Sequence, residues 1–112
     1  GAGMVKEAAV EYKRASNLEP HNPYFLKQQG FCHYRQKEYD QAIRCLKEAF
    51  QKDPLDYVVR KTLEKSYDAR GDIGAYLTLL EETLLQHPEQ KSLLGTIRRI
   101  RKRLNTALPE PA

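Results

Sequence analysis

Proline recurs at a fixed interval along this sequence. Pro20, Pro54 and Pro88 are spaced 34 residues apart, and each follows a helical pattern that it cannot continue, because proline lacks an N–H group and clashes with the preceding turn. Other positions keep the same register. The aligned sets are Ala8, Ala42 and Tyr76; Tyr12, Leu46 and Leu80; Ala15, Ala49 and Thr83; Tyr39 and Ile73; and the pairs Lys37-Glu38 and Gly71-Asp72. A period of this length predicts a stack of repeated supersecondary units.

Each period contains two helical patterns. In residues 23–56 the first helix is expected over about residues 23–36, because Asn22 is a suitable N-cap and Pro23 suits the first helical turn. The second helix is expected over about residues 39–52, where apolar side chains recur at helical spacing. The sequence therefore predicts a pair of antiparallel helices in this segment.

Small residues stand where these two helices would meet. Gly30 on the first helix and Ala42 and Ala49 on the second would allow a close approach, and larger neighbours such as Leu46 and Phe50 would fill the gaps. The full pattern consists of Leu26, Gly30, His33 or Tyr34, Ala42, Leu46, Ala49 and Pro54. In these positions and in its period the segment resembles a tetratricopeptide repeat (TPR).

Residues 57–90 are interpreted as a second, degenerate copy of this repeat. The retained positions are Leu63, Tyr67, Gly71, Leu80 and Pro88. The copy departs from the pattern where Glu64 replaces the small residue and where Tyr76 and Thr83 replace alanines. We therefore expect its two helices to pack differently or more loosely.

The flanking segments complete the predicted array. Residues 5–22 are interpreted as the second helix of a partial repeat, and residues 91–104 as a basic capping helix with one apolar face. Residues 1–4 resemble a cloning scar or a bare start and are left out of the predicted fold, and residues 105–112 are expected to be a disordered tail. The predicted fold class is all-α: a TPR-like α-solenoid of antiparallel helix pairs with about six helices, including the C-terminal capping helix.

The sequence carries no motif for catalysis or for a cofactor. It contains no Gly-rich phosphate loop, H-E-x-x-H or G-x-S-x-G pattern, and its two cysteines and three histidines are too scattered to form a metal site. Cys32 and Cys45 are interpreted as buried, reduced thiols, which favours a reducing compartment such as the cytoplasm, and His33 as a packing residue. No apolar stretch is long enough to span a membrane. We therefore expect neither an enzyme nor a cofactor.

The resemblance implies that the first helices of the repeats line a concave groove, which binds a peptide or a helical segment of another protein. Aromatic and arginine side chains concentrate binding energy at interfaces; here Phe31 favours a partly apolar ligand, and the cations favour an acidic one. The residues expected on this groove are Tyr24, Lys27, Phe31, Tyr34, Arg35, Val58, Lys61, Lys65, Asp68, Ser92, Arg99, Lys102 and Arg103. The alternative is that Phe31 and Tyr34 pack between repeats and that the cations only coat the surface.

Some TPR proteins hold chaperone C-termini with a two-carboxylate clamp of Lys, Asn and Arg residues. Lys27 fits this pattern, but the other places are filled by Phe31, Thr62, Ser92 and Thr96. The resemblance therefore does not extend to a chaperone clamp.

The basic capping helix offers a second kind of partner. Between Lys91 and Leu104 the chain has six cations and no carboxylate, although its net charge is only +4. The cations are Lys91, Arg98, Arg99, Arg101, Lys102 and Arg103. They indicate either a site for RNA, an acidic partner or an anionic surface, or a polar cap that keeps the end of the array in water. No aromatic residue is interleaved with them, which argues against base stacking.

The N-terminal helix is expected to expose an apolar edge. Ala8, Tyr12 and Ala15 stand where the next repeat uses Ala42, Leu46 and Ala49 to contact its own first helix. An uncovered apolar stripe is a sticky surface. It predicts either further repeats upstream or a dimer in which a second copy covers the edge.

Overall fold

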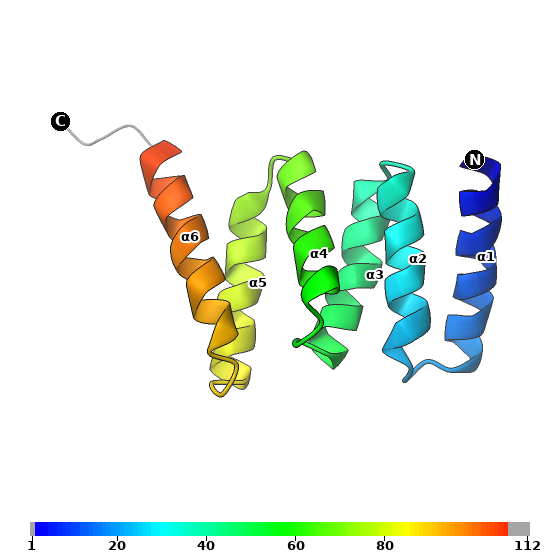
Figure 1. Cartoon of the computed structure of the whole chain (residues 1–112), viewed down its shortest axis with the longest axis horizontal. Coiled ribbons are helices and arrows are strands. Elements are labelled where there is room, and N and C mark those ends of the chain that lie inside the picture. The colour runs from blue at the N-terminus through cyan, green and yellow to red at the C-terminus, as the bar shows by residue number, and fades with distance from the viewer. Residues whose placement is uncertain (1, 108–112) are drawn as a thin grey trace. The chain divides into compact units, whose positions relative to one another are not determined.

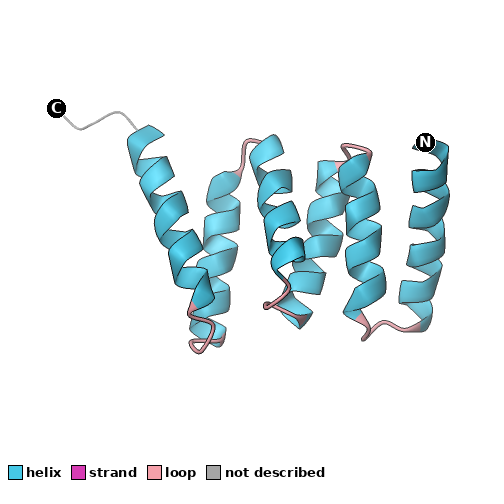
Figure 2. Cartoon of the chain, in the orientation of Figure 1, coloured by secondary structure: helices cyan, strands magenta, loops and turns pink. Residues whose placement is uncertain are grey.

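The computed structural model describes residues 2–107, with the side chains of residues 3–105. All the regular structure in this part of the chain is helical (Figures 1 and 2). The helices are α1 (Ala2–Leu18), α2 (Pro23–Arg35), α3 (Tyr39–Lys52), α4 (Tyr57–Ala69), α5 (Ile73–Gln86) and α6 (Ser92–Ala107). The all-α, helical-repeat fold class is thereby confirmed.

Helices α1 to α5 end close to where the sequence predicts. α1, α3 and α5 each end shortly before one of the periodic prolines. α2 ends at a tight turn in which Lys37 has a left-handed φ of 60°, and α4 ends at the equivalent turn, where Gly71 has a φ of 71°. Glycine adopts this conformation at little cost, whereas Lys37 adopts it in a turn held by hydrogen bonds from the N–H groups of Lys37 and Glu38 to preceding carbonyls.

Two predicted boundaries are wrong. α1 begins at Ala2 instead of Val5, so residues 2–4 belong to the fold; nothing in that stretch breaks a helix, and Met4 and Val5 contribute to a groove on α1. α6 continues to Ala107 instead of Leu104, because no helix-breaking residue precedes Pro109. The remainder of the expected tail, residues 108–112, lies outside the described part of the chain.

The chain comprises two compact units. The N-terminal unit, residues 1–71, contains α1 to α4, and the C-terminal unit, residues 72–112, contains α5 and α6. The boundary falls between α4 and α5, the two helices of the expected degenerate repeat. How loosely those two helices pack therefore stays a prediction.

The N-terminal unit is built around α2 and α3. α2 contacts α1 on one side and α3 and α4 on the other, and α3 also contacts α4 (Figure 1). Ala42, Leu46, Ala49 and Phe50 of α3 are buried almost completely. α2 approaches this row most closely at Gly30, where a β-carbon would lie 2.6 Å from Leu46 Cγ. The small residues therefore do bring these helices together as predicted.

Side-chain caps define where α2 and α4 begin. The Asn22 side chain accepts a hydrogen bond from the Tyr24 N–H at 3.0 Å. One repeat later, the Asp56 carboxylate accepts one from the Val59 N–H at 3.1 Å. Both caps satisfy backbone donors that the first helical turn leaves unpaired.

The C-terminal unit is a helical hairpin. α6 directs Leu93, Ile97 and Ile100 against α5, and these side chains are buried almost completely. Arg101 and Glu81 join the two helices in an ion pair at 2.6 Å. Among the described helices of the two units, none has the length and apolar character needed to cross a membrane.

Candidate functional site

The predicted groove residues of the N-terminal unit lie on α2 and α4. Tyr24, in the first turn of α2, is 47% exposed. Its ring lies edge-on to Phe25, with the centroids 5.4 Å apart, and Lys27 Nζ lies 5.9 Å from the Tyr24 centroid. The start of α2 therefore presents the exposed ring of Tyr24 next to the ammonium group of Lys27.

Lys27 has a partner within the chain. Its Nζ donates a hydrogen bond of 2.9 Å to Asp56 Oδ2, at the N-cap of α4. Burial by itself would raise the pKa of the Asp56 carboxyl, but the bond from Lys27, those from the Val59 and Val58 N–H groups, and the Lys27 charge outweigh it, so this pKa is lowered. Lys27 therefore fastens α2 to α4, a role that the sequence did not predict for it.

Phe31, Tyr34 and Arg35 follow on the second half of α2. Phe31 and Tyr34 are half-buried, and the Tyr34 ring lies 5.9 Å from that of Tyr39, at the start of α3. Arg35 is exposed and forms no ion pair with the described residues. Tyr34 thus packs within its own repeat and not between repeats as the alternative interpretation had it, whereas the Arg35 guanidinium remains open to a partner.

Lys61 and Lys65 lie one turn apart on α4. Both side chains are exposed, and neither forms an ion pair with the rest of residues 2–107. Val58, at the start of the same helix, is 59% exposed. α4 therefore adds two available cations and an apolar side chain to those of α2.

Arg99, Lys102 and Arg103 belong to the C-terminal unit. All three are exposed on α6, and each already interacts with other residues of the chain. The structure brings them together with Arg98 on one helix, which is the basic cluster that the sequence indicated. That they continue the surface of α2 and α4 stays a prediction.

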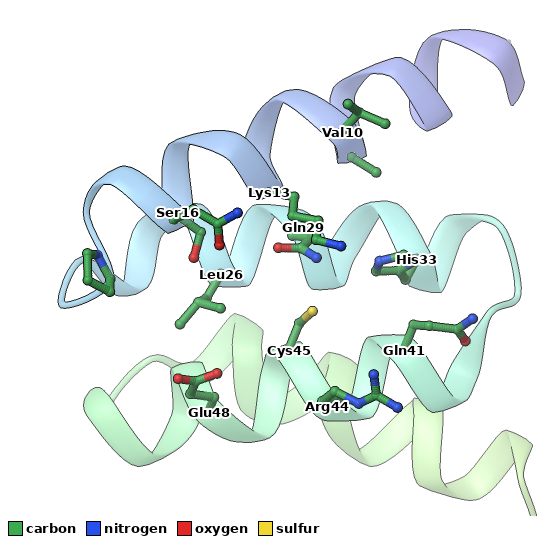
Figure 3. A pocket seen from close by; sticks show the side chains of 13 residues that line it. Val10, Lys13, Ser16, Leu26, Gln29, His33, Gln41, Arg44, Cys45 and Glu48 are labelled. Atoms are coloured by element: carbon green, nitrogen blue, oxygen red, sulfur yellow. The ribbon is translucent and has the colours of Figure 1, made fainter.

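A cleft between α1, α2 and α3 was missed by the sequence analysis (Figure 3). It has a volume of about 560 Å³. Ala9 and Ser16 of α1 align in the repeat with the larger Ile43 and Phe50 of α3. The smaller side chains of α1 leave the space between the three helices partly unfilled. This substitution of small for large side chains at aligned positions is the signal that could have found the cleft.

The lining of this cleft is mixed in charge and polarity. Polar and charged residues such as Lys13, Gln29, Gln41, Arg44 and Glu48 line it together with apolar ones. Figure 3 shows the Cys45 thiol pointing into it. Burial raises the pKa of this thiol, and the charge of Glu48 adds to the effect, while Arg44 and Lys13 oppose it. A thiol held in its protonated form is a poor nucleophile, so the cleft favours a packing role for Cys45.

The two cysteines match the prediction of buried, reduced thiols. Both are free and buried. Burial also raises the pKa of the Cys32 thiol, with Arg35 opposing the rise. His33 is half-buried, with Nδ1 3.4 Å from Glu38 Oε1. Within residues 2–107, no three His, Cys, Asp or Glu side chains are grouped as a metal site requires.

Comparison with protein families identifies the helix pair α2–α3. Residues 23–56 match the family model of the tetratricopeptide repeat. This segment is similar to a tetratricopeptide repeat. The matched segment contains Gly30 and its contact with Leu46, together with the exposed Tyr24 and Arg35. TPRs mediate protein–protein interactions and are in general scaffolds rather than enzymes. No curated protein matches the chain.

Proposed function

We propose that the chain is a protein-interaction scaffold that binds a peptide or helical segment of a partner on α2 and α4. The observation that carries this proposal is the set of exposed side chains on the two helices: the ring of Tyr24 and the cation Arg35 on α2, and the cations Lys61 and Lys65 on α4. Tyrosine and arginine are among the side chains that anchor partners at interfaces, and the two lysines add positive charge that attracts an acidic partner. The ligand that fits them is acidic and partly apolar.

Charge reversal on α4 tests this surface. Partners are captured on the wild-type protein and identified by mass spectrometry, and the purified partner is titrated calorimetrically. Lys61→Glu with Lys65→Glu removes two attractive charges and adds two repulsive ones. Rim charges each contribute modestly, so we expect affinity to fall about ten-fold or more, equivalent to about 1.4 kcal/mol.

The matched control reverses two cations on α3. Lys47 and Lys52 are also exposed, so Lys47→Glu with Lys52→Glu makes the same change in net charge at another place. We expect this control to alter affinity less than two-fold. Equal losses in the two double variants would show that only net charge matters, and the proposed surface on α2 and α4 would be wrong.

The basic helix α6 supports a second candidate function, the binding of RNA or an anionic surface. Lys91, Arg98 and Arg99 are exposed, and α6 itself carries no carboxylate. Binding to phosphates releases counterions and weakens steeply as salt rises. Titration with a single-stranded RNA or with anionic vesicles at several salt concentrations measures that slope. Binding that is steep in salt and lost in Arg98→Ala with Arg99→Ala would favour this function over the first.

A further inference from the structure

The cleft of Figure 3 lies on a different side of α1 from the face that a preceding repeat helix would cover. In the repeat register, such a helix would pack against Ala8, Tyr12 and Ala15, because α2 contacts α3 at their aligned counterparts. None of these three residues lines the cleft, which α1 borders with side chains such as Val10 and Lys13. Whatever precedes residue 1, the register therefore leaves this cleft open.

Two polar side chains in the walls of the cleft are held out of water without a partner. Ser16 of α1 is only 8% exposed, and Gln29 of α2 is half-buried. Both line the cleft, and neither side chain forms a hydrogen bond with another residue of the described range 2–107. Polar groups that folding removes from water are normally paired. These two therefore indicate a ligand that carries hydrogen-bonding groups of its own.

Arg44 and Glu48 place opposite charges on the same wall of the cleft. They stand one helical turn apart on α3 and so lie on the same side of that helix. Neither forms an ion pair with the described residues, and Lys13 borders the cleft from α1. Burial raises the pKa of the Cys45 thiol, Glu48 raises it further, and Arg44 and Lys13 lower it. All three charges thus lie near the thiol that points into the cleft.

The spacing of the charges on α3 matches that of an extended peptide. The β-carbons of residues one helical turn apart are separated by about 5–6 Å. Side chains two residues apart in an extended chain point to the same side and are about 6–7 Å apart. An acidic residue opposite Arg44 and Lys13, with a basic residue two positions away opposite Glu48, would therefore place each charge beside its opposite.

The remaining polar residues suit the rest of such a peptide. Between Val10 and Asn17, α1 borders the cleft over about 10 Å, which is the length of about three extended residues. The Gln29 carboxamide both donates and accepts, so it can pair with backbone groups that an extended segment leaves unpaired within itself. Figure 3 shows Ser16 and Glu48 toward the same end of the cleft, where the hydroxyl can accept a hydrogen bond from the basic residue.

We propose that the cleft between α1, α2 and α3 binds an extended segment of a partner protein in which an acidic and a basic residue are separated by one residue. The acidic side chain pairs with Arg44 and Lys13, the basic one pairs with Glu48 and Ser16, and Gln29 binds the backbone between them. This inference goes beyond the proposed function, because no residue of the proposed surface on α2 and α4 lines the cleft.

The probe is the peptide acetyl-Val-Glu-Val-Lys-Val-amide, whose β-branched valines favour an extended backbone. Its control, acetyl-Val-Val-Glu-Lys-Val-amide, has the same composition but directs the two charges to opposite sides of an extended chain. Each peptide is titrated into the isotope-labelled whole chain, and the amide NMR signals are followed. We expect saturable shifts over residues 9–17 and 41–48, and at least three-fold tighter binding of the probe than of the control.

Two charge reversals on α3 test the pairing. Arg44→Glu places a carboxylate opposite the acidic residue of the probe, and like charges repel. Lys47→Glu makes the same change in net charge at an exposed position outside the cleft. We expect Arg44→Glu to weaken binding of the probe at least five-fold and to tighten binding of acetyl-Val-Lys-Val-Lys-Val-amide, whereas Lys47→Glu should change either affinity less than two-fold.

The Lys61→Glu, Lys65→Glu protein should bind the probe as the wild type does, which separates this test from that of the proposed function. Four results would overturn the inference: no saturable binding at millimolar peptide, equal affinities for the probe and its control, equal weakening by Arg44→Glu and Lys47→Glu, or shifts centred on α4. A wild-type dimer that Arg44→Glu dissociates in the analytical ultracentrifuge would also overturn it, because a second copy would then fill the cleft.

Discussion

At the scale of single residues, Gly30 is the position where the helices of the TPR have least room. The small residues Gly30, Ala42 and Ala49 could be recognised from the sequence because they stand at the small-residue positions of the TPR pattern that residues 23–56 resemble. The role of Lys27 could not. Its bond to Asp56 spans 29 residues of sequence and depends on where the α3–α4 turn lies relative to α2, which periodicity does not specify.

Gly30→Leu is expected to destabilise the fold by about 3 kcal/mol, at the upper end for overpacking a close contact. The loss outweighs the gain of about 1 kcal/mol from replacing glycine in a helix, because the new side chain would meet Leu46, which is fully buried. Urea unfolding measures the difference.

The matched control is Gly95→Leu on α6. Gly95 is exposed, and a β-carbon there would meet nothing within 4 Å. Only the helix propensity then changes, so we expect this variant to be neutral or slightly stabilised. If the two leucine variants unfolded at the same urea concentration, the close contact between α2 and α3 would not be the reason why position 30 requires a small residue.

At the scale of helices, the prolines and caps made the number of elements and most of their limits predictable. The cleft of Figure 3 was not, because it depends on the difference in volume between Ala9 or Ser16 and their aligned partners. Of the residues predicted for the proposed binding surface, Tyr24, Arg35, Lys61 and Lys65 are exposed on α2 and α4, while Lys27 and Tyr34 contribute to packing within the unit; that this surface binds a partner stays a prediction.

The Lys27–Asp56 pair, which joins α2 to α4, predicts how the free energy of unfolding depends on pH. The pKa of Asp56 is lowered in the folded state, so folding is favoured by the ionised carboxylate. This contribution is fully present above the unfolded pKa of about 3.9, and it is lost as pH falls through the lower folded-state pKa. Asp56→Asn keeps a good N-cap but removes the charge, so it should lose stability at neutral pH.

Urea unfolding of both proteins between about pH 7 and pH 2 checks this expectation, over the range in which the Asp56 linkage acts. The difference in unfolding free energy between wild type and Asp56→Asn should be largest at neutral pH and should shrink in acid. A difference that stayed constant down to the lowest pH would mean that the cap geometry of Asp56, and not its charge, stabilises the start of α4.

At the scale of the whole molecule, the chain combines an N-terminal unit that contains the TPR-like helix pair with a helical hairpin whose second helix, α6, is basic. The repeat period was sufficient to predict the all-α fold, because each unit of the period contains two helices that bury their apolar faces on neighbours. It does not determine which surface binds a partner, since exposed cations occur on α4 and α6 alike. The central claim is that the partner binds on α2 and α4.

Hydrogen–deuterium exchange of the chain, with and without its captured partner, tests that claim most directly. Amides protected by binding report which helices the partner covers or stabilises. We predict added protection in α2 and α4, over Pro23–Arg35 and Tyr57–Ala69, and little change in α6. Protection confined to Ser92–Ala107 would contradict the account and assign partner binding to the basic helix.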